Sequence, residues 1–126
     1  MNTKFKFALT VVVSAALGAA AMYGLHAQGK PVAYAIVFQD VIDDAKFQPI
    51  VQGFSAEQAK QGGKFLVRGK PVATIDGTAP GRVTVTQYQD VDAAKKFYAS
   101  DAVKKLLADR KNLVKNSTVI VVEGVQ

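Results

Sequence analysis

Hydrophobic and polar residues follow two different periods along the chain after its first 28 residues. Residues 32–38 form a nearly continuous β-branched and aromatic run, which predicts a strand covered on both faces. Residues 82–88 alternate instead, which predicts a strand with one polar and aromatic face. Further strands are predicted over residues 64–68, 71–75 and 118–122. Gly69 and Lys70 predict a tight turn that joins the strands before and after them into a hairpin.

A first helix is predicted between the first two strands, because apolar residues recur there at helical spacing. Asp43 and Asp44 supply capping side chains at its start, and the glycine pair at 62–63 ends it. Pro49 falls near its first turn and predicts a late start or a kink. A second helical segment starts at Asp90, restarts at Ser100 or Asp101, and is closed by Asn112 and Asn116.

The predicted order of elements is β-α-β-β-β-α-β, whose core is the split β-α-β arrangement of ferredoxin-like folds. The predicted class is therefore α+β, with the helices on one face of an antiparallel sheet. The other face is expected to carry Tyr34, Thr84, Thr86 and several valines, which together are too apolar to be left in water. We therefore expect a second copy of the chain to cover this face, so that the protein is a homodimer.

The N-terminal segment has the composition of an export signal. Residues 8–25 carry no charge and follow two lysines, the order of a basic n-region and an apolar h-region. This predicts a signal peptide over residues 1–27, a domain over residues 28–126, and a periplasmic or secreted location. Leu25 departs from the small residue expected at the cleavage site, and the uncharged run reaches the lower length limit of a membrane-spanning helix. An uncleaved membrane tether through residues 8–25 is the alternative.

Composition limits the partners, cofactors and reactions that we expect for the domain. The whole chain has 16 basic and 10 acidic residues, and two of the lysines belong to the N-terminal segment. This mild surplus, without a dense basic stripe, argues against nucleic acid as a partner. The chain lacks cysteine, and its one histidine, His26, lies in the signal region. We therefore expect no disulfide, no metal site and no cofactor in the domain. Helix capping accounts for Asp43, Asp44, Asp90 and Asp101, which leaves paired-acid catalysis without support.

Three residues are the candidate ligand-binding site, namely Arg68, Arg82 and Tyr98. An arginine held at the end of a strand can grip a planar carboxylate through two parallel hydrogen bonds. Each candidate, and also Arg110 at the end of the next helix, has a plain structural alternative. The arginines can form ion pairs with Asp40, Asp76 or Glu123, Tyr98 can be a core aromatic residue with its hydroxyl at the surface, and Arg110 can favour a helix C-terminus.

Four short motifs point to a known family. They are Gly-Gly-Lys-Phe-Leu-Val-Arg-Gly at 62–69, Arg-Val at 82–83, Phe-Tyr-Ala-Ser at 97–100 and Glu-Gly at 123–124. With these motifs, residues 31–125 resemble the domain of unknown function 1330 family, within the dimeric α+β barrel superfamily. The resemblance implies a ferredoxin-like protomer that pairs sheet to sheet, and it implies no established activity.

Two positions depart from the family pattern. Lys70 replaces a second glycine after the arginine, and Ala102 with Val103 stands where a tyrosine is common.

Two classes of function follow from the predicted fold, the composition and the candidate residues. The first is a noncatalytic homodimeric module that binds a small anionic or aromatic ligand or has a structural role. The alternative is a cofactor-free enzyme, oxygenase-like or isomerase-like, in which the three candidate residues orient an anionic aromatic or lactone substrate.

Overall fold

The structure is a computed structural model, and it describes residues 29–125. Within this part, Val32–Val125 form one compact unit. The predicted signal peptide or tether lies outside the described residues. No helix within residues 29–125 combines the length and the apolar character needed to cross a bilayer.

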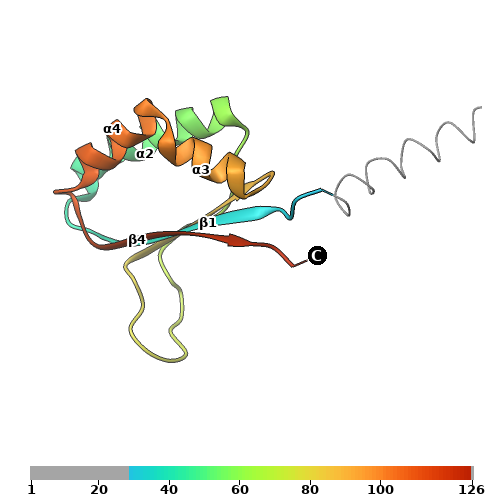
Figure 1. Ribbon diagram of the computed structural model, residues 1–126. Helices are drawn as coiled ribbons and strands as arrows, with labels where there is room; N and C mark the ends of the chain where they lie inside the picture. The colour runs from blue at the N-terminus through green and yellow to red at the C-terminus, as the bar shows by residue number, and fades with distance from the viewer. Residues whose placement is uncertain (1–28, 126) are drawn as a thin grey trace, which may run out of the picture. The chain divides into compact units, whose positions relative to one another are not determined.

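Four strands and three helices make up the unit. In chain order they are β1 (Ala33–Val41), α2 (Asp44–Gln61), β2 (Lys64–Gly69), β3 (Arg82–Tyr88), α3 (Val91–Ala99), α4 (Asp101–Arg110) and β4 (Val114–Glu123). The strands form one antiparallel sheet in the order β2-β3-β1-β4, and the helices all cover the same face of it (Figure 1). Because β3 lies between β1 and β2, the β1-α2-β2 unit is split. The predicted ferredoxin-like α+β class is therefore confirmed.

The ends of helix α2 follow the predicted signals. The Asp43 carboxylate accepts a hydrogen bond from the Lys46 backbone N–H at 3.1 Å, and Gly62 ends the helix in the left-handed region at φ 78°. Asp44 lies in the first turn, where its charge favours the helix dipole, rather than at the cap. The helix begins before Pro49, so the predicted late start is wrong; the Asp43 cap fixes the first turn ahead of the proline.

The second helical segment is two helices, as the restart signal predicted. Asp90 caps α3 by accepting a hydrogen bond from the Ala93 N–H at 2.7 Å. Ser100 separates α3 from α4 in an extended conformation, with its hydroxyl donating to the Phe97 carbonyl at 2.8 Å. That hydroxyl is therefore not the cap of α4, whose first residue is Asp101.

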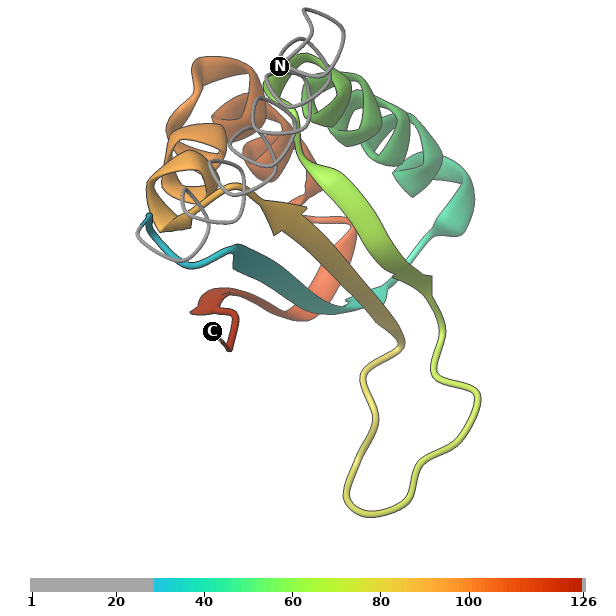
Figure 2. The ribbon, with the colours of Figure 1, turned by 90° about the vertical axis from the view of Figure 1, so that its right-hand side faces the viewer.

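The strand predicted over residues 71–75 is absent. Instead, residues 70–81 form a long loop that connects β2 directly to β3 (Figure 2). Pro71 has no N–H to donate to a strand ladder, and β2 already pairs along its length with the longer, regularly alternating β3. The hairpin therefore forms between β2 and β3, with a loop much wider than the predicted turn.

Strand β4 starts four residues before the predicted residue 118, at Val114. Asn116 does not close the preceding helix; it lies inside β4 with φ 52°, a conformation that asparagine tolerates better than most residues. Its side-chain N–H donates to the Asp40 carboxylate at 2.9 Å. The irregular pairing between β1 and β4 at this point explains why a simple alternation rule missed the start of the strand.

The two faces of the sheet differ in their cover. Ala33 and Ala35 of β1 are completely buried beneath the helices. Thr84 and Thr86 pair across the sheet with residues of this same face, so the expectation that they belong to the opposite face is wrong. Tyr34 lies on the opposite face, as predicted, and we call that face the open face. Its eleven side chains are Tyr34, Ile36, Phe38, Lys64, Val67, Val83, Val85, Gln87, Thr118, Ile120 and Val122.

Candidate functional site

A cavity lies between the covered face of the sheet and the helices. Its volume is about 60 Å³, enough for roughly four water-sized groups. Its walls come from all four strands and all three helices. They are Val37, Gln39, Phe47, Val51, Phe54, Gln58, Phe65, Arg68, Arg82, Thr84, Thr86, Phe97, Tyr98, Leu107, Arg110 and Val119.

The charge of this lining has one sign. Among the described residues that form it there are three arginines and no aspartate, glutamate or histidine. The candidates Arg68, Arg82 and Tyr98 are all in the lining, so the fold brings them together from β2, β3 and α3. Arg110 joins them from the last turn of α4. A cavity of this kind attracts anions and repels cations.

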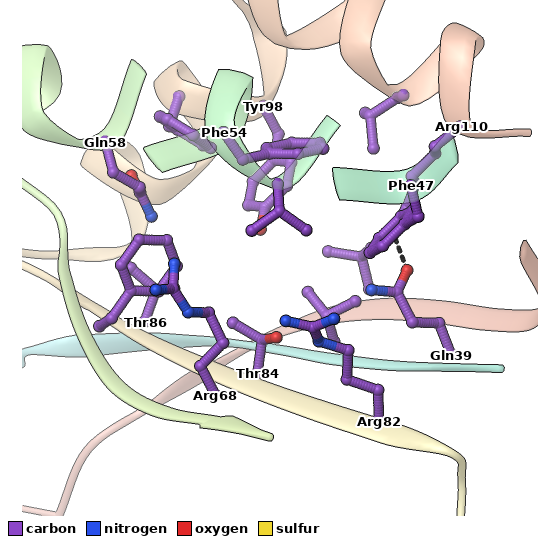
Figure 3. A pocket seen from close by; sticks show the side chains of 16 residues that line it. Gln39, Phe47, Phe54, Gln58, Arg68, Arg82, Thr84, Thr86, Tyr98 and Arg110 are labelled. Carbon is purple, nitrogen blue, oxygen red and sulfur yellow. Dashed lines mark hydrogen bonds between the residues drawn. The ribbon is translucent and has the colours of Figure 1, made fainter. Parts of the chain in front are cut away.

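Arg68 and Arg82 reach up from neighbouring strands toward the space below the helices (Figure 3). Arg68 is exposed; its guanidinium donates to the Ser55 hydroxyl at 3.0 Å and lies 4.7 Å from the centre of the Phe65 ring. The Arg82 guanidinium is half-buried and lies 5.7 Å from the centre of the Phe47 ring. These are cation–π contacts, which hold a guanidinium in place without neutralising its charge.

Within residues 29–125, the structure does not contain the ion pairs that were the alternative role predicted for these arginines. In the described part of the chain, no carboxylate pairs with Arg68, Arg82 or Arg110. Asp40 is engaged elsewhere: its carboxylate accepts hydrogen bonds from the Gly81 N–H at 2.6 Å and from Asn116. These hydrogen bonds lower the pKa of Asp40, that from Asn116 more than that from Gly81.

Arg110 is the deepest of the three arginines, with 8% of its surface exposed. Its guanidinium donates to the Gln39 side-chain oxygen at 2.7 Å. Burial lowers the pKa of Arg110, but a guanidinium stays charged in proteins at any ordinary pH. A favourable interaction with the helix C-terminus does not by itself explain the position of Arg110, because its side chain turns inward to Gln39, a neutral partner on β1.

Tyr98 presents its hydroxyl to the cavity (Figure 3), not to the surface as the alternative had it. Its ring packs edge to face on Phe97, with ring centres 5.1 Å apart. Burial raises the pKa of Tyr98, and the nearby positive charge of Arg110 only partly opposes this effect. Tyr98 is therefore a neutral hydroxyl near neutral pH, able to donate a hydrogen bond to an anion.

A buried polar pair lies beside the cavity, and Gln58 is its member in the cavity lining. The Gln58 amide contacts the Tyr88 hydroxyl, with 2.7 Å between the amide nitrogen and the oxygen. Burial raises the pKa of Tyr88, so this hydroxyl also stays neutral. Gly63 leaves room for the amide, because a Cβ at this position would lie 2.5 Å from the Gln58 side-chain oxygen.

Gln39 and Gln58 also line the cavity, although neither was predicted as a site residue. Both had a usable signal. Gln39 continues the alternation of Ala33, Ala35 and Val37, which places a polar side chain on a buried strand face. Gln58 lies four residues after Phe54 and so continues the apolar stripe of its helix.

The arrangement suits binding better than proton transfer. Arginine, tyrosine, threonine and glutamine supply hydrogen-bond donors around the cavity, and phenylalanine rings supply apolar walls. None of these side-chain types exchanges a proton near neutral pH without a large pKa shift toward that range. The geometry therefore fits a carboxylate or similar anion attached to a small apolar group.

A four-stranded antiparallel sheet with helices on one face and an arginine-lined cavity between the layers defines the class of this protein, a ferredoxin-like α+β domain. The chain belongs to the domain of unknown function 1330 family, whose sequence profile matches residues 32–125. The family resemblance read from the four short motifs is thereby confirmed. No curated protein is significantly similar to the chain in sequence.

Solved structures with the same fold have very different sequences. A protein of unknown function from Rhodopseudomonas palustris superposes with a TM-score of 0.63 at 11% identity, over 84% of this chain and 93% of that one. A hydroxynitrile lyase from Passiflora edulis gives 0.62 at 10% identity, over 76% and 95%. A cofactor-independent oxygenase from Streptomyces nogalater gives 0.56 at 16% identity, over 76% and 95%. At such identities the likeness concerns the fold alone.

Proposed function

We propose that the protein is an exported, homodimeric module that binds a small anionic, partly aromatic molecule in the cavity between its sheet and its helices. The observation that carries this proposal is the set of three arginines in a lining without a carboxylate. Keeping such charges together without a counterion costs stability, so the arrangement needs a compensating role. Binding an anion is that role.

A bound carboxylate accepts hydrogen bonds from the guanidinium groups that line the cavity and from the Tyr98 hydroxyl, with Arg68 gripping it through two parallel hydrogen bonds. An attached ring packs against Phe47 and Phe54. The cavity of about 60 Å³ takes the anionic group as it stands. A ring needs more room, and it can extend toward solvent beside the exposed side chain of Arg68, whose guanidinium stays on the carboxylate. Arg68 then forms the mouth of the site and Arg110 its floor.

The homodimer is proposed from the open face. Eight of its eleven side chains are apolar or aromatic, and Ile120 and Val122 are 39% and 40% exposed. A face of this kind needs cover, and a second copy of the same face is complementary to it by two-fold symmetry. In this arrangement each protomer keeps its own cavity on the far side of its sheet.

Export is proposed from the sequence of residues 8–25, which lack charge and follow two lysines. The location is then periplasmic or secreted if the signal is cleaved, and the membrane surface if the segment remains as a tether. Either outcome places the domain in a compartment where a cysteine-free chain relies on packing and association for stability.

A cofactor-free enzyme is the second candidate. A hydroxynitrile lyase and a cofactor-independent oxygenase share the fold, so the scaffold accommodates such chemistry in other proteins. Arg68, Arg82 and Tyr98 would then orient an anionic substrate and stabilise charge that develops on it. The binding module is preferred because no lining residue is a ready proton shuttle.

Calorimetric titration of the purified protein with benzoate and phenylacetate tests the site, with benzamide as the uncharged ligand control. We expect Arg68→Lys and Arg82→Ala to weaken carboxylate binding about ten- to a hundredfold, the effect of losing one charged bidentate contact. Arg68→Lys retains the charge but loses the two-pronged geometry. Lys64→Ala is the control: it removes a positive charge from the open face of β2, the strand that also holds Arg68, and should leave the affinity within about twofold.

Equal binding of benzamide and benzoate would contradict the anion site. Unchanged affinity in both arginine variants would mean that the arginines are structural. Product formation from an aromatic or lactone compound, followed by chromatography, would favour the enzyme over the module.

A further inference from the structure

The loop of residues 70–81 between β2 and β3 has the properties of an arm. It carries two large aliphatic side chains in full contact with solvent, Val72 at 103% and Ile75 at 95% exposure. Within the described structure, residues 70–80 form no hydrogen bond with the rest of the domain. Loops of about this length without internal structure are uncommon in compact domains, where they are functional segments or linkers.

A hydrogen bond fixes the base of this arm at Gly81, whereas the rest of the arm makes no hydrogen bond with any described residue of the domain. The Gly81 N–H donates to the Asp40 carboxylate, which also holds Asn116 of β4. A side chain at Gly81 would come within 2.9 Å of that carboxylate, so the close approach needs glycine. Pro71 and Pro80 stiffen the two ends of the arm. The arm therefore projects in a defined direction, to the side of the sheet opposite the helices (Figure 1).

We infer that each copy of the chain lays its 70–81 arm on the other copy, so that Val72 and Ile75 are buried against the partner. This inference rests on the proposed homodimer. The open face supplies eleven side chains and the arm supplies twelve residues, which makes 23 on each side. A standard stable interface involves about 20–30 residues a side, so the sheet face alone falls short and the arm completes it.

The charge of the arm favours a protein partner over a lipid surface. Lys70 and Asp76 are its only charged residues, and they cancel. Segments that bind anionic membranes need an excess of lysine or arginine beside their apolar residues. The open face is likewise nearly uncharged, with Lys64 at its edge. An apolar, neutral arm and an apolar, neutral face are complementary to each other.

Sedimentation equilibrium of the purified protein and single variants tests the inference. We expect Val72→Asp and Ile75→Asp each to raise the dimer dissociation constant about tenfold or more, because each puts a charge where an aliphatic side chain was buried. Ala59→Asp is the control: it places the same charge at an exposed position of α2, on the other side of the sheet from the open face, and its effect should stay below about threefold. Ile120→Asp on the open face should dissociate the dimer irrespective of the arm.

A second measurement uses the absence of cysteine. Ile75→Cys carries a single thiol, which takes a photoreactive benzophenone maleimide. Irradiation should give a covalent dimer whose cross-link maps to the partner, whereas cross-links confined to one chain would overturn the inference.

The outcomes test the role of the arm and the existence of the dimer separately. A wild-type protein that is monomeric at micromolar concentration would overturn the homodimer and the arm with it. A wild-type dimer that Ile120→Asp dissociates, but Val72→Asp and Ile75→Asp do not, would overturn the arm alone. Co-sedimentation with anionic lipid vesicles that Ile75→Asp abolishes, with the dimer unchanged, would assign the arm to a lipid surface instead.

Discussion

Replacing Arg110 should lower the ligand affinity of this protein without lowering its stability. The side chain is 8% exposed, carries a charge, and has one neutral hydrogen-bond partner, Gln39 at 2.7 Å. We expect Arg110→Met, which keeps much of the length and removes the charge, to abolish tight carboxylate binding. We expect the same substitution to leave the free energy of unfolding nearly unchanged, and the double variant Arg110→Met, Gln39→Met to raise it.

The magnitude follows from two opposing contributions. Removing a buried charge relieves a desolvation cost of several kcal/mol, and apolar replacement of buried ionic groups often stabilises by about 1–4 kcal/mol. The lost hydrogen bond to Gln39 costs about 1.5–3 kcal/mol, and Gln39 is then left without its partner. The single variant should therefore lie within about 1 kcal/mol of the wild type. The double variant, which removes both polar groups, should be more stable by about 1–3 kcal/mol.

Urea unfolding followed by circular dichroism measures stability, at one fixed protomer concentration because a dimer is stabilised by mass action. Calorimetry with benzoate measures affinity, which should fall at least about tenfold in both variants. A double variant that loses more than about 2 kcal/mol of stability while it keeps its affinity would refute the reasoning. Arg110 would then be a structural residue whose charge the fold uses.

Two further predictions follow from other parts of the chain. The lowered pKa of Asp40 means that the ionised carboxylate stabilises the fold above its unfolded pKa, and that this stabilisation is lost as the pH falls through the lower folded value. Asp40→Asn should therefore remove one acid-sensitive component below about pH 4, which acid titration of the fold by circular dichroism checks. For the N-terminal segment, we expect export with cleavage after Ala27 or nearby, or an intact N-terminus in membranes if the tether is retained. N-terminal sequencing of soluble and membrane fractions decides this, and an intact Met1 found only in cytosol would contradict export.

The local elements of the fold were predictable because their signals are local. Asp43 and Asp90 cap helices through backbone groups three residues away, and Gly62 ends a helix with its own φ angle. The alternation over residues 82–88 coincides with the bounds of β3. Two of the errors in the fold occurred at residues 71–75 and at Asn116, where pairing with another strand decides the conformation.

The candidate site was predictable in part. Arg68, Arg82 and Tyr98 were selected for their chemistry, and the fold brings all three to one cavity. The depth of Arg110 and its contact with Gln39 join residues 71 positions apart. Periodicity within either segment gives no information on such a pair.

What the sequence determined by itself is that the sheet has two unlike faces, because a strand period of two separates its side chains without regard to the rest of the chain. It did not determine which face the helices would cover, and Thr84 and Thr86 were assigned to the wrong one. The tertiary structure decided this through β1, whose small Ala33 and Ala35 let the helices approach one face closely. Cross-strand register then carried the threonines and the arginines to the same side. The cavity is therefore a product of packing between layers, which depends on side-chain volumes far apart in the chain.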